Sequence, residues 1–517
     1  MKKFLVLTGT IVLVVFVSLN LLAFQPWESH YTDESKVFQS EKTISFESIL
    51  NRYRAPSTET GTSGKDIILI TLDTLRADHL SSYGYFKKTS PFLDSLAEEG
   101  VLFTRAYAPS GNTAPSHATI LSGLYPIQHR IMKNGHKMSL DIETMPELLQ
   151  KAGYKTAGIT SIPRFWKPAH IAQGFDFFNQ PTDEETMIKS DNADQPRPFY
   201  YRPAERTLSH AQNWIKNNMK NDDKPTFLWI HLFDPHNNLV YREDYYDLMT
   251  PKSPEQREQY ESFIRENHHF ELDPLVNLGG ENYFIDYDDT RKRAYRKYDA
   301  EIRYMDDQLK KFYDFLERTG ARPDLSIVAG DHGQGNGNHN WWFHGKNIYN
   351  EQVRIPFIMH WKDKRHRGSK IDTVIELNDI APTILYEAGV NPATIDKHRQ
   401  LPIEGSSLQR LIKGERSGFG YAFVQRRAFD PVSWSEGYIK YVRNQLGNTS
   451  QTHRLATDYE SGRRFALINS KHNYMYATEH TDEFYNLRND FYQQQNLIRE
   501  KLPQRDIMAS TVVDLIS

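Results

Sequence analysis

The chain of 517 residues contains no cysteine. This absence excludes disulfides, thiolate zinc sites, iron–sulfur clusters and cysteine nucleophiles together. The chain also has no excess of either charge, since 63 Lys and Arg oppose 66 Asp and Glu for a formal net charge of −3, which argues against a strongly basic nucleic-acid binder. Glycine (28) and proline (25) occur at ordinary frequencies, so collagen-like and low-complexity classes are excluded. What remains is a chain long enough to bury a sizeable core in one large domain with a smaller partner, or in two to four domains.

One long apolar segment, residues 4–24, follows two lysines at the N-terminus. It is long enough to cross a bilayer as a helix. A cleavable signal peptide has a shorter apolar core and a small-residue cleavage site, which residues 21–23 resemble poorly. We therefore predict an uncleaved membrane anchor over residues 1–24, with a cleaved signal and a secreted protein as the alternative. The two lysines predict a cytoplasmic N-terminus and a body on the extracytoplasmic (periplasmic) side of the cell membrane.

Residues 25–64 are polar and rich in Ser, Thr and Glu, which is typical of a tether. Beyond them, short apolar runs rich in β-branched residues and Leu have the pattern of buried parallel strands. These runs are residues 66–73, 156–160, 227–233, 325–329 and 355–361. Helical patterns lie between them, and this alternation predicts an α/β fold with a large parallel-rich sheet sandwiched by helices.

Three helices have recognisable signals. One is framed by Ser90-Pro91 and Gly100, another begins with a capping box at residues 144–147, and a third has one apolar face over residues 295–316. Residues 237–290 are aromatic and charged and interrupt the alternation, so we expect an insertion that could act as a lid. After residue 415, short alternating runs and a late helix predict a small α+β C-terminal subdomain over residues 415–517.

Chemically distinctive residues stand at three points of this pattern. Asp73 ends the first predicted strand, Thr113 lies where a helix opens, and Asp331 and His332 follow a late strand. Ligands of parallel sheets bind at the carboxyl ends of the strands, so these side chains can meet. Two carboxylates, an imidazole and a hydroxyl suit one divalent cation, which would make the hydroxyl a nucleophile. Each residue alone also has a structural interpretation, because Asp and Thr commonly cap turns and helices.

In this combination the chain resembles the sulfatase-like branch of the alkaline phosphatase superfamily, over about residues 65–500. The resemblance rests on motifs that occur in the family's order along the chain. They are residues 72–79, Thr113-Ala114-Pro115-Ser116-His117, residues 121–126, Phe233-Asp234-Pro235-His236, residues 298–302, Asp331-His332-Gly333, His344-Gly345, residues 349–356 and Phe484-Tyr485-Asn486-Leu487 with Asn489-Asp490. It implies an alkaline-phosphatase-like fold with residues 65–414 as the catalytic domain.

The resemblance also implies roles for single residues. It implies one divalent metal ion, of which Mn, Mg, Ca and Zn all remain open, held by Asp73, Thr113, Asp331 and His332. Thr113 would also be the nucleophile, while His236 and His344 match positions that bind the anion or protonate the leaving group. Asn134 matches a position near the transferred group. Thr74 stands where many sulfatases have a second metal-binding Asp, and would be a substrate contact or a neutral filler.

Structural alternatives stay open for several of these residues. His236 could cap the turn after Pro235, His344 could be a stacked surface histidine, and Asn134 with the following glycine is an ordinary turn pair. His117 stands where many sulfatases have Arg and receives no role. The family's Lys-Trp-His segment is absent, and residues 164–167 read Arg-Phe-Trp-Lys instead.

The nucleophile position is the main departure from the family. Sulfatases proper use a formylglycine made from Cys or Ser, and Thr113 cannot yield that aldehyde. A Thr ester must be broken by attack at its central atom, which is familiar for phosphorus and less favourable for a sulfate ester. We therefore predict a membrane-anchored, metal-dependent hydrolase or transferase of phosphoesters, with a lipid headgroup, a glycan or a small molecule as the anionic substrate. The alternatives are a sulfatase that works without formylglycine and an inactive relative that binds anions or glycans; a nucleic-acid partner is not expected.

Overall fold

The computed structural model describes the greater part of the chain after residue 63. The described residues are 64–163, 165–182, 184–186, 201–219, 224–236, 242–267, 275–278, 281–284, 287–336, 338–340, 342–391, 402–415, 420–428 and 462–516. The predicted anchor (1–24) and nearly all of the predicted tether (25–64) lie outside these residues. Among the helices that the structure describes, none has the length and apolar character needed to cross a membrane.

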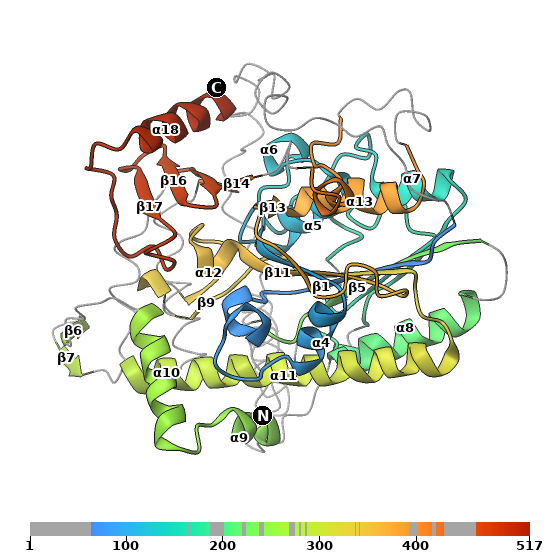
Figure 1. Cartoon of the computed structure of the whole chain (residues 1–517), viewed down its shortest axis with the longest axis horizontal. Helices are drawn as coiled ribbons and strands as arrows, with labels where there is room; N and C mark the ends of the chain where they lie inside the picture. The colour runs from blue at the N-terminus through green and yellow to red at the C-terminus, as the bar shows by residue number, and fades with distance from the viewer. Residues whose placement is uncertain are drawn as a thin grey trace, which may run out of the picture. The chain divides into compact units, whose positions relative to one another are not determined.

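A nine-stranded sheet forms the centre of the described chain (Figure 1). Its strand order is β12-β2-β11-β8-β1-β5-β3-β4, and β13 pairs with β2. The strands are β1 (Ile67–Leu72), β2 (Val101–Tyr107), β3 (Lys155–Thr160), β4 (Phe177–Asn179), β5 (Thr226–Leu232), β8 (Leu325–Gly330), β11 (Arg354–Trp361), β12 (Ser369–Ile371) and β13 (Ile375–Glu376). β1 lies between β5 and β8 and is parallel to both.

All five predicted strands are present, and the parallel-rich α/β sheet is confirmed. β11, however, runs antiparallel to both of its neighbours, β2 and β8. A strand buried on both faces has a continuous apolar sequence in either direction, so its orientation could not be read from the residues. β2, β4, β12 and β13 were not predicted.

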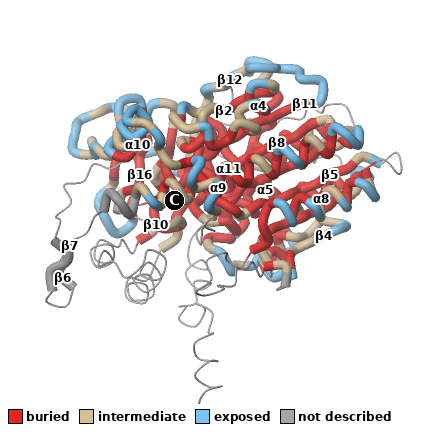
Figure 2. The backbone as a smooth tube through the Cα atoms, turned by 90° about the horizontal axis from the view of Figure 1, so that it is seen from below, coloured by how far each residue is buried: buried red, intermediate tan, exposed pale blue. Residues whose placement is uncertain are grey.

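Helices cover both faces of this sheet (Figure 1). Side chains of β1 alternate between two cores, with Ile67 and Leu69 in one and Ile68 and Ile70 in the other. The first core contains residues of α5 (Thr113–Ser122), α7 (Met145–Lys151) and α13 (Ile380–Glu387), and the second contains residues of α4 (Pro91–Glu99), α8 (Ala204–Asn218) and α11 (Tyr287–Thr319). Figure 2 shows the consequence: the central strands of the sheet are buried, and most exposed residues lie on the outer helices and loops.

The three predicted helix signals are confirmed. α4 begins at Pro91 and ends before Gly100. α7 begins at Met145, directly after its N-cap Thr144, which forms a capping box with Glu147. α11 carries the predicted apolar face but begins earlier, at Tyr287.

In its described residues, the region predicted as an insertion contains α9 (Glu243–Met249), α10 (Pro254–Asn267), the antiparallel strands β6 (Leu275–Leu278) and β7 (Glu281–Phe284), and the first residues of α11. Its role as a lid stays a prediction. The remaining described elements are short: η1 (Ala77–His79), η2 (Ser81–Tyr83), α6 (Pro126–His129), η3 (Glu184–Thr186), β9 (Gly335–Asn336), η4 (Asn338–Asn340), β10 (Trp342–Phe343), α12 (Asn350–Val353), η5 (Leu377–Asp379) and α15 (Leu408–Ile412).

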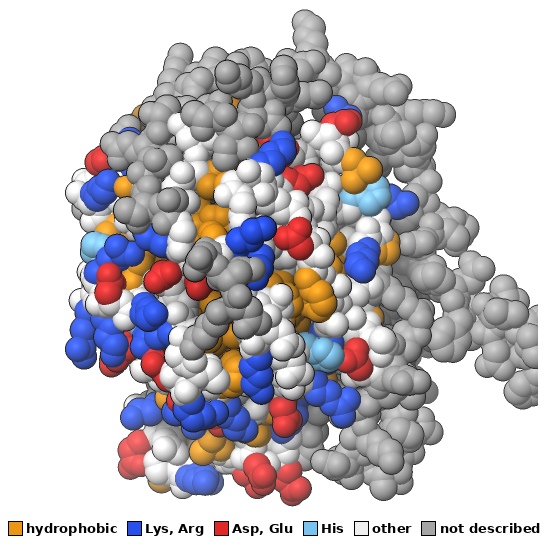
Figure 3. Space-filling view, turned by 90° about the vertical axis from the view of Figure 1, so that its right-hand side faces the viewer, with side chains coloured by type: hydrophobic (Ala, Val, Ile, Leu, Met, Phe, Trp, Pro, Cys, Tyr) orange, Lys and Arg blue, Asp and Glu red, His pale blue; other side chains and the backbone are white. Residues whose placement is uncertain are grey.

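A separate antiparallel sheet forms the C-terminal part, in the order β14-β15-β16-β17. Its elements are β14 (Tyr421–Arg426), β15 (Arg464–Asn469), β16 (His472–Ala477) and β17 (Glu483–Asn486), followed by α18 (Pro503–Ile516). Its apolar side chains share a core with Tyr107, Ile348 and Val353 of the larger part. The predicted α+β C-terminal architecture is confirmed, while the boundary at residue 415 stays a prediction. On the face drawn in Figure 3, basic and acidic side chains are interspersed.

Candidate active site

The candidate site lies at the carboxyl ends of two adjacent parallel strands. Asp73 follows β1 and Asp331 follows β8, and the register pairs Leu72 with Gly330, the residues just before them. His332 comes next in the chain, and all three side chains are fully buried. Their ligand atoms lie within 4.8 Å of one another. The sheet thus brings together the predicted carboxylates and imidazole.

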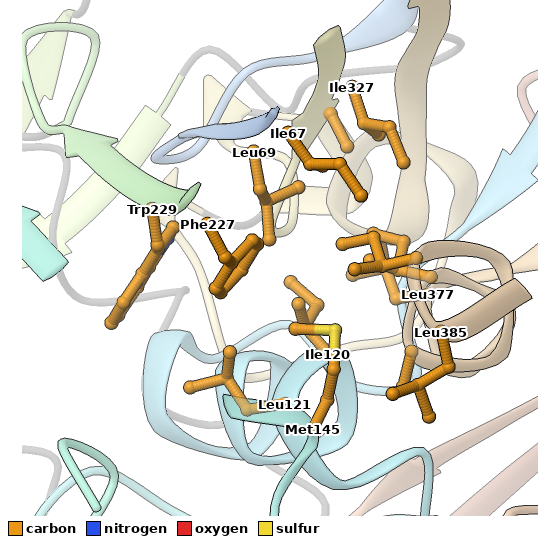
Figure 4. Close-up of a cluster of buried hydrophobic side chains, with 14 of the residues drawn as sticks. Ile67, Leu69, Ile120, Leu121, Met145, Phe227, Trp229, Ile327, Leu377 and Leu385 are labelled. Carbon is orange, nitrogen blue, oxygen red and sulfur yellow. The ribbon is translucent and has the colours of Figure 1, made fainter. Parts of the chain in front are cut away.

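α5 brings Thr113 to the same edge. Ile120 and Leu121 of α5 pack toward the apolar side chains of β1 and β5 (Figure 4), which directs the first turn of the helix to the strand ends. Thr113 is the first residue of α5. Its Oγ1 lies 3.2 Å from His332 Nε2 and 3.5 Å from Asp73 Oδ2. The four predicted metal ligands therefore form one cluster.

The cluster has the chemistry that a divalent cation requires. Asp73 Oδ1 and Asp331 Oδ2 are buried and have no hydrogen-bond partner among the described residues. Burial raises the pKa of both carboxyls, and the nearby charge of Asp73 adds to the rise at Asp331. A cation would neutralise the two carboxylates and fill the positions that the chain leaves open. The residues present thus fit the metal ion that the resemblance implies.

His332 is held in the tautomer that a ligand needs. Its Nδ1–H donates to the carbonyl oxygen of Gly333 at 2.9 Å, so Nε2 keeps its lone pair on the side of Thr113 and the carboxylates. Burial lowers the pKa of His332 to about 3. The imidazole is therefore neutral at pH 7, as metal coordination requires.

His236 and His344 form a row of imidazoles with His332. The ring centroids of His344 and His332 are 4.6 Å apart, and those of His236 and His344 are 4.8 Å apart. His236 stacks on Phe233 at 3.9 Å, and His344 Nδ1 lies 3.1 Å from Gln334 Oε1. Both rings are half-buried, whereas His332 is fully buried, so the row extends from the cluster toward solvent.

The other two predicted residues contact the cluster in different ways. Asn134 is exposed, and its Oδ1 accepts a hydrogen bond from the backbone N–H of Ala114 at 2.9 Å, in the first turn of α5. Thr74 is buried with φ 55°. Its N–H donates to Asp331 Oδ1 at 3.1 Å, and its hydroxyl donates to the carbonyl oxygen of Asp73 at 2.7 Å. Thr74 thus ties the Asp331 carboxylate to the backbone that follows β1.

Sequence reasoning missed a buried lysine near His344. Lys346 is only 5% exposed. Burial lowers the pKa of its ammonium well below the ordinary value, and the charges of Arg427 and Arg426 add to this. Its position two residues after His344 was the available signal. A negatively charged group bound beside it would favour the ammonium form.

The comparisons with known proteins agree with this geometry. The family model described as Sulfatase matches residues 65–390, and that described as N-sulphoglucosamine sulphohydrolase, C-terminal, matches residues 337–511. An N-acetylglucosamine-6-O-sulfatase of Bacteroides thetaiotaomicron is 24% identical over 419 residues, which cover 68% of this chain and 72% of the relative. An arylsulfatase of Clostridium perfringens is 26% identical over 401 residues, which cover 68% of this chain and 79% of the relative. The crystal structure of the phosphonate monoester hydrolase of Agrobacterium radiobacter has a TM-score of 0.64 at 19% identity, covering 87% of this chain and 95% of that one.

The first family match spans more than half of the chain, so the chain belongs to the sulfatase family. The predicted resemblance and the alkaline-phosphatase-like fold are confirmed. The protein is a hydrolase of this family that acts on ester bonds.

Proposed function

We propose that the protein is a metal-dependent hydrolase or transferase of anionic phosphoesters, with Thr113 as its nucleophile. One observation carries the proposal: Thr113 Oγ1 lies within 3.5 Å of both His332 Nε2 and Asp73 Oδ2, at the N-terminus of α5. A helix N-terminus favours an anionic group, so an ester bound there would face this hydroxyl.

Some of these residues would bind the cation, and others position the nucleophile or contact the ester. Asp73, Asp331 and His332 would hold the divalent cation, together with Thr113. When bound, such an ion lowers the pKa of a neighbouring hydroxyl and neutralises charge on the ester. Asn134 keeps the first turn of α5 in place through the N–H of Ala114. Lys346 lies near His344, and the charge of a bound ester would favour its ammonium form.

The reaction then has two displacement steps. The Thr113 oxygen, its proton lost to solvent, attacks phosphorus; the Oγ1–P bond forms and the P–O bond to the leaving group breaks. The leaving oxygen takes a proton from His344 or His236. Water or an alcohol acceptor then attacks the same phosphorus, gives its proton to that imidazole and displaces the Thr113 oxygen. Burial lowers the pKa of His344 well below the ordinary value, so His344 acts as the acid only after the negative charge of the ester raises its pKa.

The choice of phosphorus follows from the residue at position 113. A threonine ester has no second hydroxyl that could expel the group, so the group must leave by attack at its central atom. Such attack is more favourable at phosphorus than at sulfur. The fold likeness to a phosphonate monoester hydrolase is in keeping with a phosphorus substrate.

A sulfuric ester hydrolase that works without formylglycine is the second candidate. The names of the relatives favour it, since they include an N-acetylglucosamine-6-O-sulfatase and an arylsulfatase. A relative that only binds anions or glycans is the third candidate, but it would have no need for buried carboxylate oxygens that lack a hydrogen-bond partner.

The test is a turnover assay on the full chain in detergent. The substrates are the p-nitrophenyl esters of sulfate, phosphate, phosphate diester and phenylphosphonate, each offered with Mn²⁺, with Zn²⁺ and with a chelator. We expect cation-dependent cleavage of phosphorus esters and little release of sulfate. Dominant sulfate release would make the second candidate correct, and no turnover with any ester would favour the third.

The proposal includes the location of the enzyme. Residues 1–24 would anchor the chain in the cell membrane, with the catalytic part on the extracytoplasmic side. A headgroup or an envelope glycan would then be within reach of the site. Release of the protein from membranes by high-pH carbonate would contradict a spanning anchor.

A further inference from the structure

Two histidines outside the predicted ligand set lie directly behind it. His231 is on β5 and His117 is on α5, and both are fully buried. The sheet register places His231 beside Thr71 of β1, on the face that α5 covers. Their ring centroids are 4.7 Å apart. Neither histidine has a role in the reaction described above.

A chain of hydrogen bonds joins the two rings to the nucleophile helix. His117 Nδ1 lies 2.8 Å from the carbonyl oxygen of Thr113, and His117 Nε2 lies 3.0 Å from Thr71 Oγ1. Thr71 Oγ1 lies 3.1 Å from His231 Nδ1 and also accepts the indole N–H of Trp229 at 2.9 Å. This series of hydrogen bonds therefore connects the backbone carbonyl of Thr113 to the ring of His231.

The number of protons available in this series of hydrogen bonds determines the tautomer of both His117 and His231. The carbonyl of Thr113 can only accept, so the proton of neutral His117 is on Nδ1 and its Nε2 accepts. Thr71 then donates its one hydroxyl proton to that Nε2. Since Thr71 has no further proton, His231 must donate to it from Nδ1, which leaves a lone pair on His231 Nε2.

The lone pair of His231 points toward the candidate cation site. His231 Nε2 lies 3.3 Å from Asp73 Oδ2, yet it has no hydrogen-bond partner among the described residues. Two buried acceptor atoms at this separation repel each other unless positive charge lies beside both. The carboxylate of Asp73 already belongs to the proposed ligand set, so a cation there would serve both atoms.

We infer that His117 and His231 are positioning residues of the cation site, held as neutral Nδ1–H tautomers through Thr71. They fix the first turn of α5, and with it Thr113, relative to the ligand strands. His231 also directs its Nε2 lone pair toward the cation. This inference rests on the cation site of the proposed function, but not on the identity of the ester.

Aromatic packing keeps both rings in one orientation. Trp166 packs edge-on against His117 at 4.8 Å and against His231 at 5.0 Å. Trp166 lies in residues 164–167, where the family's Lys-Trp-His segment is absent. Because the rings are confined, neither can flip to exchange its nitrogens.

The first test measures the tautomers directly. The full chain, labelled with ¹⁵N-histidine, is examined in the presence of a chelator, and the two rings are assigned with His117→Asn and His231→Asn. We expect one protonated nitrogen, Nδ1, in each ring. An Nε2–H tautomer, or a doubly protonated ring, at His231 would overturn the inference. The protonation of each ring is measured in the unmodified chain, and the two variants serve only to identify which signals belong to His117 and His231.

The second test measures cation affinity by titration calorimetry with Mn²⁺ and with Zn²⁺. His231→Asn keeps a donor for Thr71 but removes the atom that faces Asp73, so we expect affinity to fall by about 10- to 100-fold. His231→Gln restores an acceptor near the Nε2 position and should recover part of this loss. A purely structural role would weaken both variants alike and would contradict the inference.

His129→Gln is the matched control. His129 is buried and bonds to Thr119 Oγ1 and to the N–H of Ile131, all away from the cluster, so its cation affinity should equal that of the unmodified chain. Failures of the two proposals remain distinguishable. If no ester is cleaved but the affinity pattern holds, only the proposed function fails; if esters are cleaved and His231→Asn binds cations normally, only this inference fails.

Discussion

Two buried carboxylates in this protein have opposite environments. Asp299 of α11 is fully satisfied by its own chain: Oδ1 accepts from His79 at 2.7 Å, and Oδ2 accepts from Tyr85 at 2.8 Å and from Lys87 at 2.9 Å. Asp331 bonds through Oδ1 to two backbone N–H groups, while its Oδ2 has no hydrogen-bond partner among the described residues. At Asp331, burial raises the pKa of the carboxyl. At Asp299, burial acts in the same direction, but the charges of Lys87 and His79 outweigh it, so the pKa is lowered.

The difference separates a structural ion cluster from a functional one. A buried charge is tolerated when its partners are built into the fold. The chain supplies all of them around Asp299, in a cluster that joins η1 to α11. Around Asp331, by contrast, the nearest charge is the repelling carboxylate of Asp73, and Oδ2 of Asp331 has no hydrogen-bond partner among the described residues. Such incomplete satisfaction indicates a missing positive charge.

The largest expected effect is a loss of turnover when the nucleophile of the candidate cation site is removed. Thr113→Ala should lower turnover by at least about 10³-fold, because no other hydroxyl takes part in the proposed displacement. Thr119→Ala, in the same helix, is the control and should keep its turnover. Initial rates with the preferred ester and thermal unfolding check both variants. Substantial activity in Thr113→Ala with its fold intact would remove Thr113 from the mechanism.

The comparison itself is tested by one substitution at each carboxylate. In chelator, Asp299→Asn should lower the free energy of unfolding by about 3 kcal/mol or more, since it leaves Lys87 and His79 without their anion. Asp331→Asn should leave stability unchanged or raise it, because it removes a buried charge that Asp73 repels. Urea unfolding of the metal-free proteins gives both values. Equal losses would show that the two carboxylates are both structural.

Cation binding should then separate the same two variants. At about 100 times its dissociation constant, Mn²⁺ or Zn²⁺ should stabilise the unmodified chain by about 2.7 kcal/mol. Asp299→Asn should keep this gain and Asp331→Asn should lose it, as measured by thermal unfolding with and without the ion. A gain that survives in Asp331→Asn would place the cation elsewhere.

Much of this site was predictable from the sequence because of the geometry of parallel strands. Continuous apolar runs located β1 and β8, and the ends of adjacent parallel strands meet at one edge. That is why Asp73 and Asp331 could be expected to lie together. Thr113 followed from the helix signal after it.

The residues behind the cluster were not predictable in this way. His231 lies inside an apolar strand run, and only the register shows that it faces Thr71. His117 depends on how α5 docks, which no local pattern encodes. The direction of β11 and the presence of β2 were missed for a similar reason, since pairing is decided by partners that are distant in the chain.

The smallest expected effect is a pH dependence of stability that comes from His339. Like Asp299, His339 lies in a cluster whose polar partners are all supplied by the protein. Its Nδ1 lies 3.0 Å from Glu351 Oε1, its Nε2 lies 3.0 Å from the carbonyl oxygen of Gln493, and its ring stacks on Tyr349 at 3.6 Å. Burial alone would lower the pKa of His339, but the Glu351 carboxylate outweighs burial and raises the pKa above the ordinary value of 6.5.

A raised pKa in the folded state means that protonated His339 stabilises the fold. This contribution is complete below the unfolded pKa and is lost as pH rises through the folded one. Thermal unfolding across pH 5–9 should therefore show a small fall in stability above pH 6.5 that His339→Gln lacks. If the two profiles run parallel, the charge of His339 contributes nothing to stability. The stability contributed by the His339 cluster should thus depend on pH without any added ion, whereas the stability contributed by the site at Asp331 should depend on an added cation.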